Sequence, residues 1–135
     1  MVTLFSAGIM PHPWEDRARP SMVGVGMYEA HGFDPGTWHT YTPSYTPFVE
    51  ADRFDKYWGA KLVMSFTPAQ IRAAISAGRI GDPVAEEYLA QQMIARQRKT
   101  GAYWFAHVNP LDHFTVRAYG DAVGLCFDDL MLTDH

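Results

Sequence analysis

The chain has 135 residues, of which 47% are hydrophobic, 14% aromatic and 19% charged, and its formal net charge is -4. This length fits one domain that buries roughly two-thirds of its unfolded surface, and this composition excludes intrinsic disorder. A net negative chain lacks the concentrated basic face that nucleic acid requires, so we expect no nucleic-acid partner. The short basic cluster Arg96, Arg98 and Lys99 is explained as a solvated helix end. The single cysteine, Cys126, excludes an internal disulfide and a thiolate metal cage.

The N-terminal residues 2–10 form an apolar run that ends at Pro11. The run lacks a basic segment before it and a cleavage site after it, so we do not interpret it as a signal peptide. It predicts a helix or strand that packs on the core. No stretch approaches the ~20 apolar residues that cross a bilayer, so no membrane span is expected.

Residues 22–30 alternate valine with Gly24 and Gly26, which predicts a short extended segment. The Gly24-Val25-Gly26 motif is a weak nucleotide signal, because it lacks a third glycine and a capping helix.

Residues 31–48 contain Pro35, Pro43 and Pro47 and predict turns and polyproline II rather than regular structure. A loop of this length in a compact domain is usually functional, or it crosses a neighbouring surface. We favour a strap across the helices that is anchored by aromatic side chains. The candidate binding residues in it are Trp38, Tyr41 and Tyr45.

Residues 50–105 predict three helices, which form the centre of the fold. Asp52 is a plausible N-cap for the first, which runs to about Met64. Thr67 and Pro68 begin the second, with a buried stripe of Ile71, Ala74 and Ile75 and with Gly78 as its left-handed terminator.

Asp82 and Pro83 open the third helix, which runs toward Phe105. Gly101 costs roughly 1 kcal/mol relative to alanine inside a helix, so the helix is expected to bend or end there. The aromatic and methionine side chains of all three helices recur at helical spacing. This spacing is typical of a core more often than of a ligand pocket.

Alternating apolar residues predict a hairpin after Asn109-Pro110, with strands over residues 111–119 and 123–127 and a turn at Gly120-Asp121. A lone two-stranded hairpin is marginal in water. Cys126 lies on the face of the second strand opposite Val123, Leu125 and Phe127, where burial would leave it inert. Apolar Leu130, Met131 and Leu132 close the chain, and we expect the element that they begin to continue beyond it.

No catalytic constellation emerges from the sequence. No pair among the six histidines has the helical spacing of a zinc site. The weak metal candidates are His31, Asp34 and His39, with Asp112 and His113 as a second set. The adjacent acidic pairs, of which Glu86-Glu87 suits a helix N-terminus, indicate no shared acid–base pocket.

Several motifs together resemble the C-terminal part of a family of large, uncharacterised bacterial proteins, many of them exported. The resemblance spans nearly the whole chain. It rests on Pro13-Trp14-Glu15, residues 23–30, Phe33-Asp34-Pro35 with Trp38, residues 45–48, Tyr57-Trp58-Gly59-Ala60-Lys61, Phe66-Thr67, residues 70–73, Gly81-Asp82-Pro83 and Asn109-Pro110-Leu111-Asp112.

The resemblance implies an upstream region similar to atypical, spore-coat-type kinases. This chain has no aspartate-phenylalanine-glycine-type element and no phosphate-binding lysine in context, so no catalytic residue is carried over. It also departs from the family at Arg96-Gln97-Arg98-Lys99, where the family shows arginine-arginine-aspartate-lysine. The family continues past both ends, which implies a fragment or a separated lobe.

The sequence therefore predicts a mainly α fold. Its three-helix core (about 50–105) lies between an irregular segment rich in proline and aromatics (1–49) and a C-terminal hairpin with its exit (107–135). We expect a non-catalytic helical module without a cofactor, which packs against a protein partner or an upstream domain and shapes a substrate cleft. Two alternatives stay open: the helical lobe of a split kinase-like phosphotransferase, and a small metal-dependent hydrolase that uses His31, Asp34 and His39. The compartment stays open too.

Overall fold

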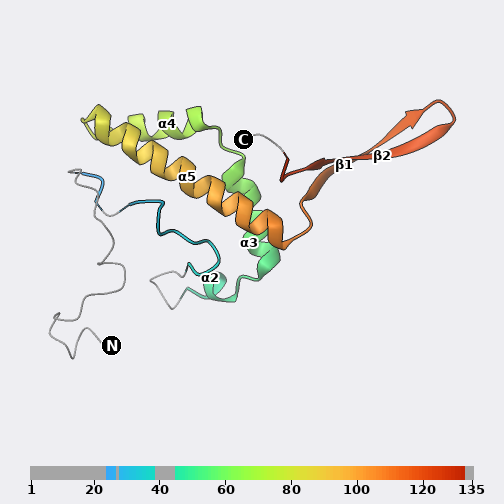
Figure 1. Cartoon of the computed structure of the whole chain (residues 1–135), viewed down its shortest axis with the longest axis horizontal. Coiled ribbons are helices and arrows are strands. Elements are labelled where there is room, and N and C mark those ends of the chain that lie inside the picture. The colour runs from blue at the N-terminus through green and yellow to red at the C-terminus, as the bar shows by residue number, and fades with distance from the viewer. Residues whose placement is uncertain (1–23, 27, 39–44, 133–135) are drawn as a thin grey trace.

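The computed structural model describes residues 24–26, 28–38 and 45–132. Within them the chain forms four helices and one antiparallel hairpin (Figure 1). These elements are α2 (Thr46–Glu50), α3 (Arg53–Met64), α4 (Pro68–Ala77), α5 (Pro83–His107), β1 (Leu111–Tyr119) and β2 (Ala122–Asp129). The mainly α fold with a C-terminal hairpin is confirmed.

The expected count of three helices is wrong, because α2 is a fourth helix within the predicted irregular segment. Pro47 sits in the first turn of α2, where a missing N–H leaves no helical bond unmade. The prediction of an extended stretch around Gly24 also fails. Residues 24–26 form a turn in which Gly24 and Gly26 have φ values of 93° and 66°, a region that glycine enters without strain.

The predicted helix starts are confirmed by their capping bonds. The Asp52 carboxylate accepts from the Phe54 and Asp55 amides at 2.7 and 3.0 Å. The Thr67 hydroxyl accepts from the Gln70 amide at 3.2 Å, while the Gln70 side chain accepts from the Thr67 amide at 2.8 Å. Capping side chains thus satisfy backbone donors that a helix N-terminus leaves free.

The predicted end of α4 is right in position and wrong in geometry. Gly78 stays right-handed with φ -70°, and the left-handed residue is Arg79 with φ 52°. The Gly78 and Arg79 amides donate to the Ile75 and Ser76 carbonyls at 2.9 and 3.1 Å. These hydrogen bonds between residues three apart form a tight turn directly after α4. The left-handed residue that ends the helical path is therefore Arg79 rather than Gly78.

The helix α5 is the central helix of the fold, and α3 and α4 both pack against it (Figure 1). Gly101 neither bends nor ends α5, contrary to the prediction. A Cβ added there would lie 2.6 Å from the Met64 sulfur, so the missing side chain lets α3 and α5 approach closely. The buried stripe of α5 consists of Ala85, Ala90, Ile94, Gln97, Gly101 and Phe105.

The buried core is small. One cluster joins Ala60 and Met64 of α3, Phe105 of α5 and Leu130, the residue after β2. On α4 only Ile75 of the predicted stripe is buried, while Ile71 is half-buried and Ala74 is exposed. Within the described residues, no helix combines the length and the apolar character needed to cross a membrane.

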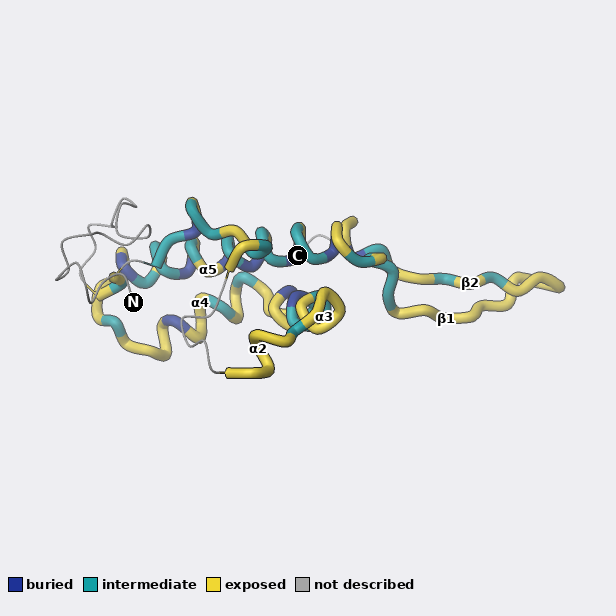
Figure 2. Tube along the Cα trace, turned by 90° about the horizontal axis from the view of Figure 1, so that it is seen from below, coloured by how far each residue is buried: buried dark blue, intermediate teal, exposed yellow. Residues whose placement is uncertain are grey.

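The hairpin extends away from the helices, and among the described elements its two strands pack mainly against each other (Figure 2). The predicted turn is confirmed, with Gly120 at φ 63°. Register places Val116 opposite Leu125 and Ala118 opposite Val123. A bulge between Asp112 and Thr115 places His113 at φ 52° near the base.

The predicted N-terminal packing element, residues 2–10, lies outside the described residues, as do Tyr41 and His39.

Candidate interaction surface

The helix α3 carries apolar side chains on two separate faces. Its inner face packs on α5, where the Tyr57 and Phe105 rings meet edge to face at 5.7 Å. Its outer face carries Phe54, Trp58 and Leu62 at four-residue intervals. These three side chains are 55%, 63% and 47% exposed. We call these three residues the outer stripe.

The outer stripe corrects the prediction that the aromatic residues of α3 are core. One face of a helix can meet α5, so the apolar residues on the other face are left in water. Fully burying a side chain of this size is worth about 1.5–3 kcal/mol, which makes the stripe a favourable contact surface for another molecule.

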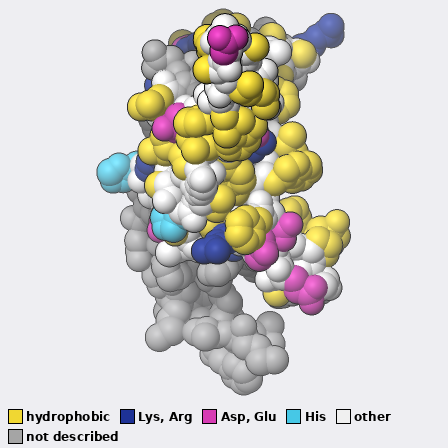
Figure 3. All heavy atoms as spheres, turned by 90° about the vertical axis from the view of Figure 1, so that its right-hand side faces the viewer, with side chains coloured by type: hydrophobic (Ala, Val, Ile, Leu, Met, Phe, Trp, Pro, Cys, Tyr) yellow, Lys and Arg dark blue, Asp and Glu magenta, His cyan; other side chains and the backbone are white. Residues whose placement is uncertain are grey.

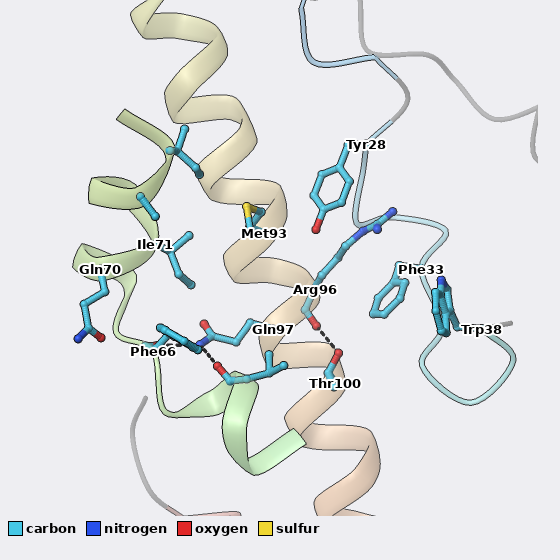
Figure 4. Close-up of a pocket in the computed structure, with 13 residues that line it drawn as sticks. Tyr28, Phe33, Trp38, Phe66, Gln70, Ile71, Met93, Arg96, Gln97 and Thr100 are labelled. Carbon is cyan, nitrogen blue, oxygen red and sulfur yellow. Dashed lines mark hydrogen bonds between the residues drawn. The ribbon is translucent and has the colours of Figure 1, made fainter. Parts of the chain in front are cut away.

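A groove opens between α4, α5 and residues 28–38, with a volume of about 860 Å³ (Figure 4). Its walls are mainly apolar, and they include Tyr28, Phe33, Phe66, Ile71, Ile75 and Met93. Phe66 follows the C-terminal end of α3 and is 56% exposed. The groove has the size and the apolar character of pockets that take small ligands or side-chain anchors.

Gln97 is the one buried polar side chain among the described residues, at 6% exposure. Its amide donates to the Val63 carbonyl at 2.8 Å and to the Phe66 carbonyl at 2.7 Å. The Val63 carbonyl lies in the last turn of α3, where it also accepts from the Phe66 amide at 3.4 Å, and the Phe66 carbonyl lies just after the helix. Gln97 therefore joins α5 to the end of α3 and fixes the residues that line the groove there. Its position within a basic run of the sequence did not suggest this role.

The far wall of the groove is held by Arg96. Its Nε donates to the Glu29 carbonyl at 2.7 Å. Its guanidinium lies 4.0 Å from the centre of the Tyr28 ring and 4.8 Å from that of Phe33 (Figure 4). Contacts of this kind contribute roughly 0.5–2 kcal/mol each.

Lys99 binds the backbone carbonyls of the same segment. Its ammonium donates to the carbonyls of Ala30, His31 and Phe33 at 2.6, 3.0 and 3.3 Å. The interpretation of this basic cluster as a solvated helix end is wrong for Arg96 and Lys99, which lie inside α5 and bind the preceding segment. No partner for these two side chains can be read from the sequence, because every residue type supplies a backbone carbonyl.

The strap hypothesis holds for residues 28–38, although charge and backbone contacts rather than aromatic burial anchor them. Trp38 lines the groove and is 56% exposed. Tyr45 does not line it; it precedes α2 and packs on Phe48 with ring centres 5.0 Å apart. Of the candidate binding residues, only Trp38 thus reaches the groove, and Tyr41 lies outside the described residues.

The candidate metal ligands take local roles where they are described. The Asp34 carboxylate accepts from the Gly36 amide at 3.0 Å and from the Thr37 hydroxyl at 2.9 Å, which closes a turn. His31 is exposed. Across residues 24–26, 28–38 and 45–132, no three His, Cys, Asp or Glu side chains are grouped to hold a metal ion.

Of the second candidate set, Asp112 joins the hairpin to α3, whereas His113 contacts the other strand of the hairpin. Asp112 forms an ion pair with Lys61, and the His113 Nδ1 lies 3.0 Å from an Asp128 carboxylate oxygen. The hydrogen bond from Lys61 holds the pKa of Asp112 below its usual value of 3.8. This arrangement fixes the base of the hairpin.

The remaining reactive candidates also have structural partners. Cys126 is half-buried rather than buried, and its sulfur lies 3.5 Å from the Tyr119 hydroxyl. Glu87 does more than complement the helix dipole, because it binds the Arg72 guanidinium of α4 through both oxygens at 3.0 and 3.1 Å. This pairing lowers the pKa of Glu87.

No family model matches the chain, and no match was found among curated proteins or among solved structures. The resemblance to large bacterial proteins therefore stays a prediction.

Proposed function

We propose that this chain is a non-catalytic module that packs against a protein partner or an adjacent domain through the outer stripe. The observation that carries the proposal is the exposure of Phe54, Trp58 and Leu62. Large apolar residues at i, i+4 and i+8 are the pattern by which one helix anchors in the hydrophobic groove of another protein.

The groove supports the finer part of the proposal, that the module shapes a cleft for a substrate or peptide. Val63 and Phe66, at and just after the C-terminal end of α3, line one side of the groove, and Arg96 and Lys99 hold the segment on its other side. The groove would receive the substrate or peptide, while the outer stripe would bind the partner.

The two alternatives remain predictions. A kinase-like lobe or a metal-dependent hydrolase requires phosphate or metal ligands, and the described contacts of Asp34 and Asp112 are explained within the chain itself. Neither has an observation in its favour.

Site-specific photo-crosslinking in the native cell tests the proposal. A photoreactive phenylalanine analogue at Trp58 should give one adduct of defined mass, whereas the same analogue at Ala102, an exposed position of α5, should not. Adding Leu62→Asp, which places a charge in the outer stripe, should abolish the adduct. An adduct that survives Leu62→Asp, or none at Trp58, would refute the proposal.

A further inference from the structure

The hairpin is a sheet with one wholly apolar face. Phe114, Val116 and Ala118 of β1 alternate onto the same face as Val123, Leu125 and Phe127 of β2. The five larger side chains are 56%, 71%, 74%, 62% and 48% exposed, in chain order. With the hairpin pointing toward the reader, hydrophobic side chains cover much of the visible surface (Figure 3).

The opposite face is mixed in polarity, and Tyr119 covers part of it. The Tyr119 ring lies over Gly124, where an added Cβ would come within 2.8 Å of it, and the Tyr119 hydroxyl reaches Cys126. Arg117 and Thr115 share this face, because they alternate with Val116. The hairpin therefore has one face of mixed polarity and one apolar face that lacks a partner within the described residues.

The apolar face tapers. Near its base the Phe114 and Phe127 rings pack at 5.8 Å, and near its tip stand Ala118 and Val123. Val116 and Leu125 form the row midway between the two. If two such faces meet base to tip, each phenylalanine pair opposes small residues, and the two sheets stay evenly spaced at about 10 Å.

We propose that this face binds a second copy of the chain, with two hairpins packed face to face and base to tip about a twofold axis at the row of Val116 and Leu125. An interface of this symmetry uses the same patch on both copies. The reverse arrangement, tip to tip, would stack phenylalanine on phenylalanine and separate the tips.

The area supports a second copy. At the exposed fractions above, with ~150–200 Å² for a whole side chain of this size, one face presents roughly 500 Å² of apolar surface. Two copies would bury on the order of 1,000 Å², which reaches the smallest size of a specific interface. The dimer is therefore expected to be weak and dependent on concentration. It uses a different surface from the outer stripe, so its failure would leave the proposed function untouched.

Light scattering coupled to size exclusion, over increasing concentrations of the full chain, tests the proposal. We expect the mass to rise from monomer to dimer, and Leu125→Asp to hold it at monomer. The control variant Thr115→Asp, on the opposite face of the hairpin, should still dimerise. A chain that stays monomeric throughout, or dimers that persist in Leu125→Asp, would overturn the proposal.

Cross-linking keeps the test independent of any loss of hairpin structure. In a Cys126→Ser background, Leu125→Cys lies on the axis and should cross-link to its own copy through a short bis-maleimide. Ala118→Cys lies away from the axis and should cross-link poorly to itself, but well to Phe114→Cys in a mixture of the two. Equal self-cross-linking at both positions would exclude the base-to-tip arrangement.

Discussion

Both the inner face and the outer stripe of α3 are apolar, but the first is buried and the second is exposed. The inner face, with Ala60 and Met64, lies against Phe105 and Gly101 of α5 and is almost completely buried. The outer stripe carries larger side chains and stays in water. The comparison shows that close approach, rather than hydrophobicity, decides which face of this helix is core, because alanine and glycine let the backbones meet.

The largest effect should come from removing the partner of the inner face. Phe105→Ala empties a site that is 3% exposed, so unfolding free energy should fall by about 3–5 kcal/mol. Val84→Ala, at a 64% exposed position of the same helix, is the matched control and should change it by less than about 0.5 kcal/mol. Urea denaturation followed by circular dichroism measures both. Equal effects would contradict the assignment of the core.

Gln97→Leu should come next. It removes the two hydrogen bonds to the Val63 and Phe66 carbonyls, each of which is worth about 0.5–1.5 kcal/mol. Gln91→Leu, at an exposed position on α5, provides the comparison. If both variants unfold at the same urea concentration, Gln97 does not hold α3 in place.

A smaller effect on stability should come from the ion pair between Lys61 of α3 and Asp112 of the hairpin, and it should depend on pH. Because Lys61 lowers the pKa of Asp112, the pair stabilises the fold above about pH 3.8, and this contribution is lost as pH falls through the lowered pKa. Lys61→Met should cost about 0.5–1 kcal/mol at pH 7 and progressively less as the pH falls below 3.8. Thermal unfolding of both proteins across this range measures the difference, and a difference that does not change with pH would argue against the ion pair.

The smallest effect on stability should come from the outer stripe, where the comparison is sharpest. Trp58→Ser should change the unfolding free energy of the isolated chain by less than about 0.5 kcal/mol, since the side chain is 63% exposed. The same variant should greatly weaken partner binding, measured as loss of the cross-linked adduct from an adjacent position. A strongly destabilised variant would mean that Trp58 belongs to the core.

The sequence predicted what local chemistry determines. The caps Asp52, Thr67 and Asp82 and the turn at Gly120 act within a few residues, so their positions were correct. It did not predict which apolar face of α3 is buried, because that depends on α5, more than 30 residues away. The bonds of Lys99 to residues 30–33 were missed for the same reason, since any residue type supplies a carbonyl.

The hydrogen bonds of Lys99 affect which substitutions this chain tolerates. The carbonyls that it binds belong to positions 30, 31 and 33, whose side chains take no part in those three bonds. Substitutions at His31 should therefore accumulate without dislodging the segment, whereas neutralising the single amine of Lys99 would release three attachments together. The attachment of the groove wall thus depends on Lys99 and Arg96 of α5 and is insensitive to the side chain at position 31.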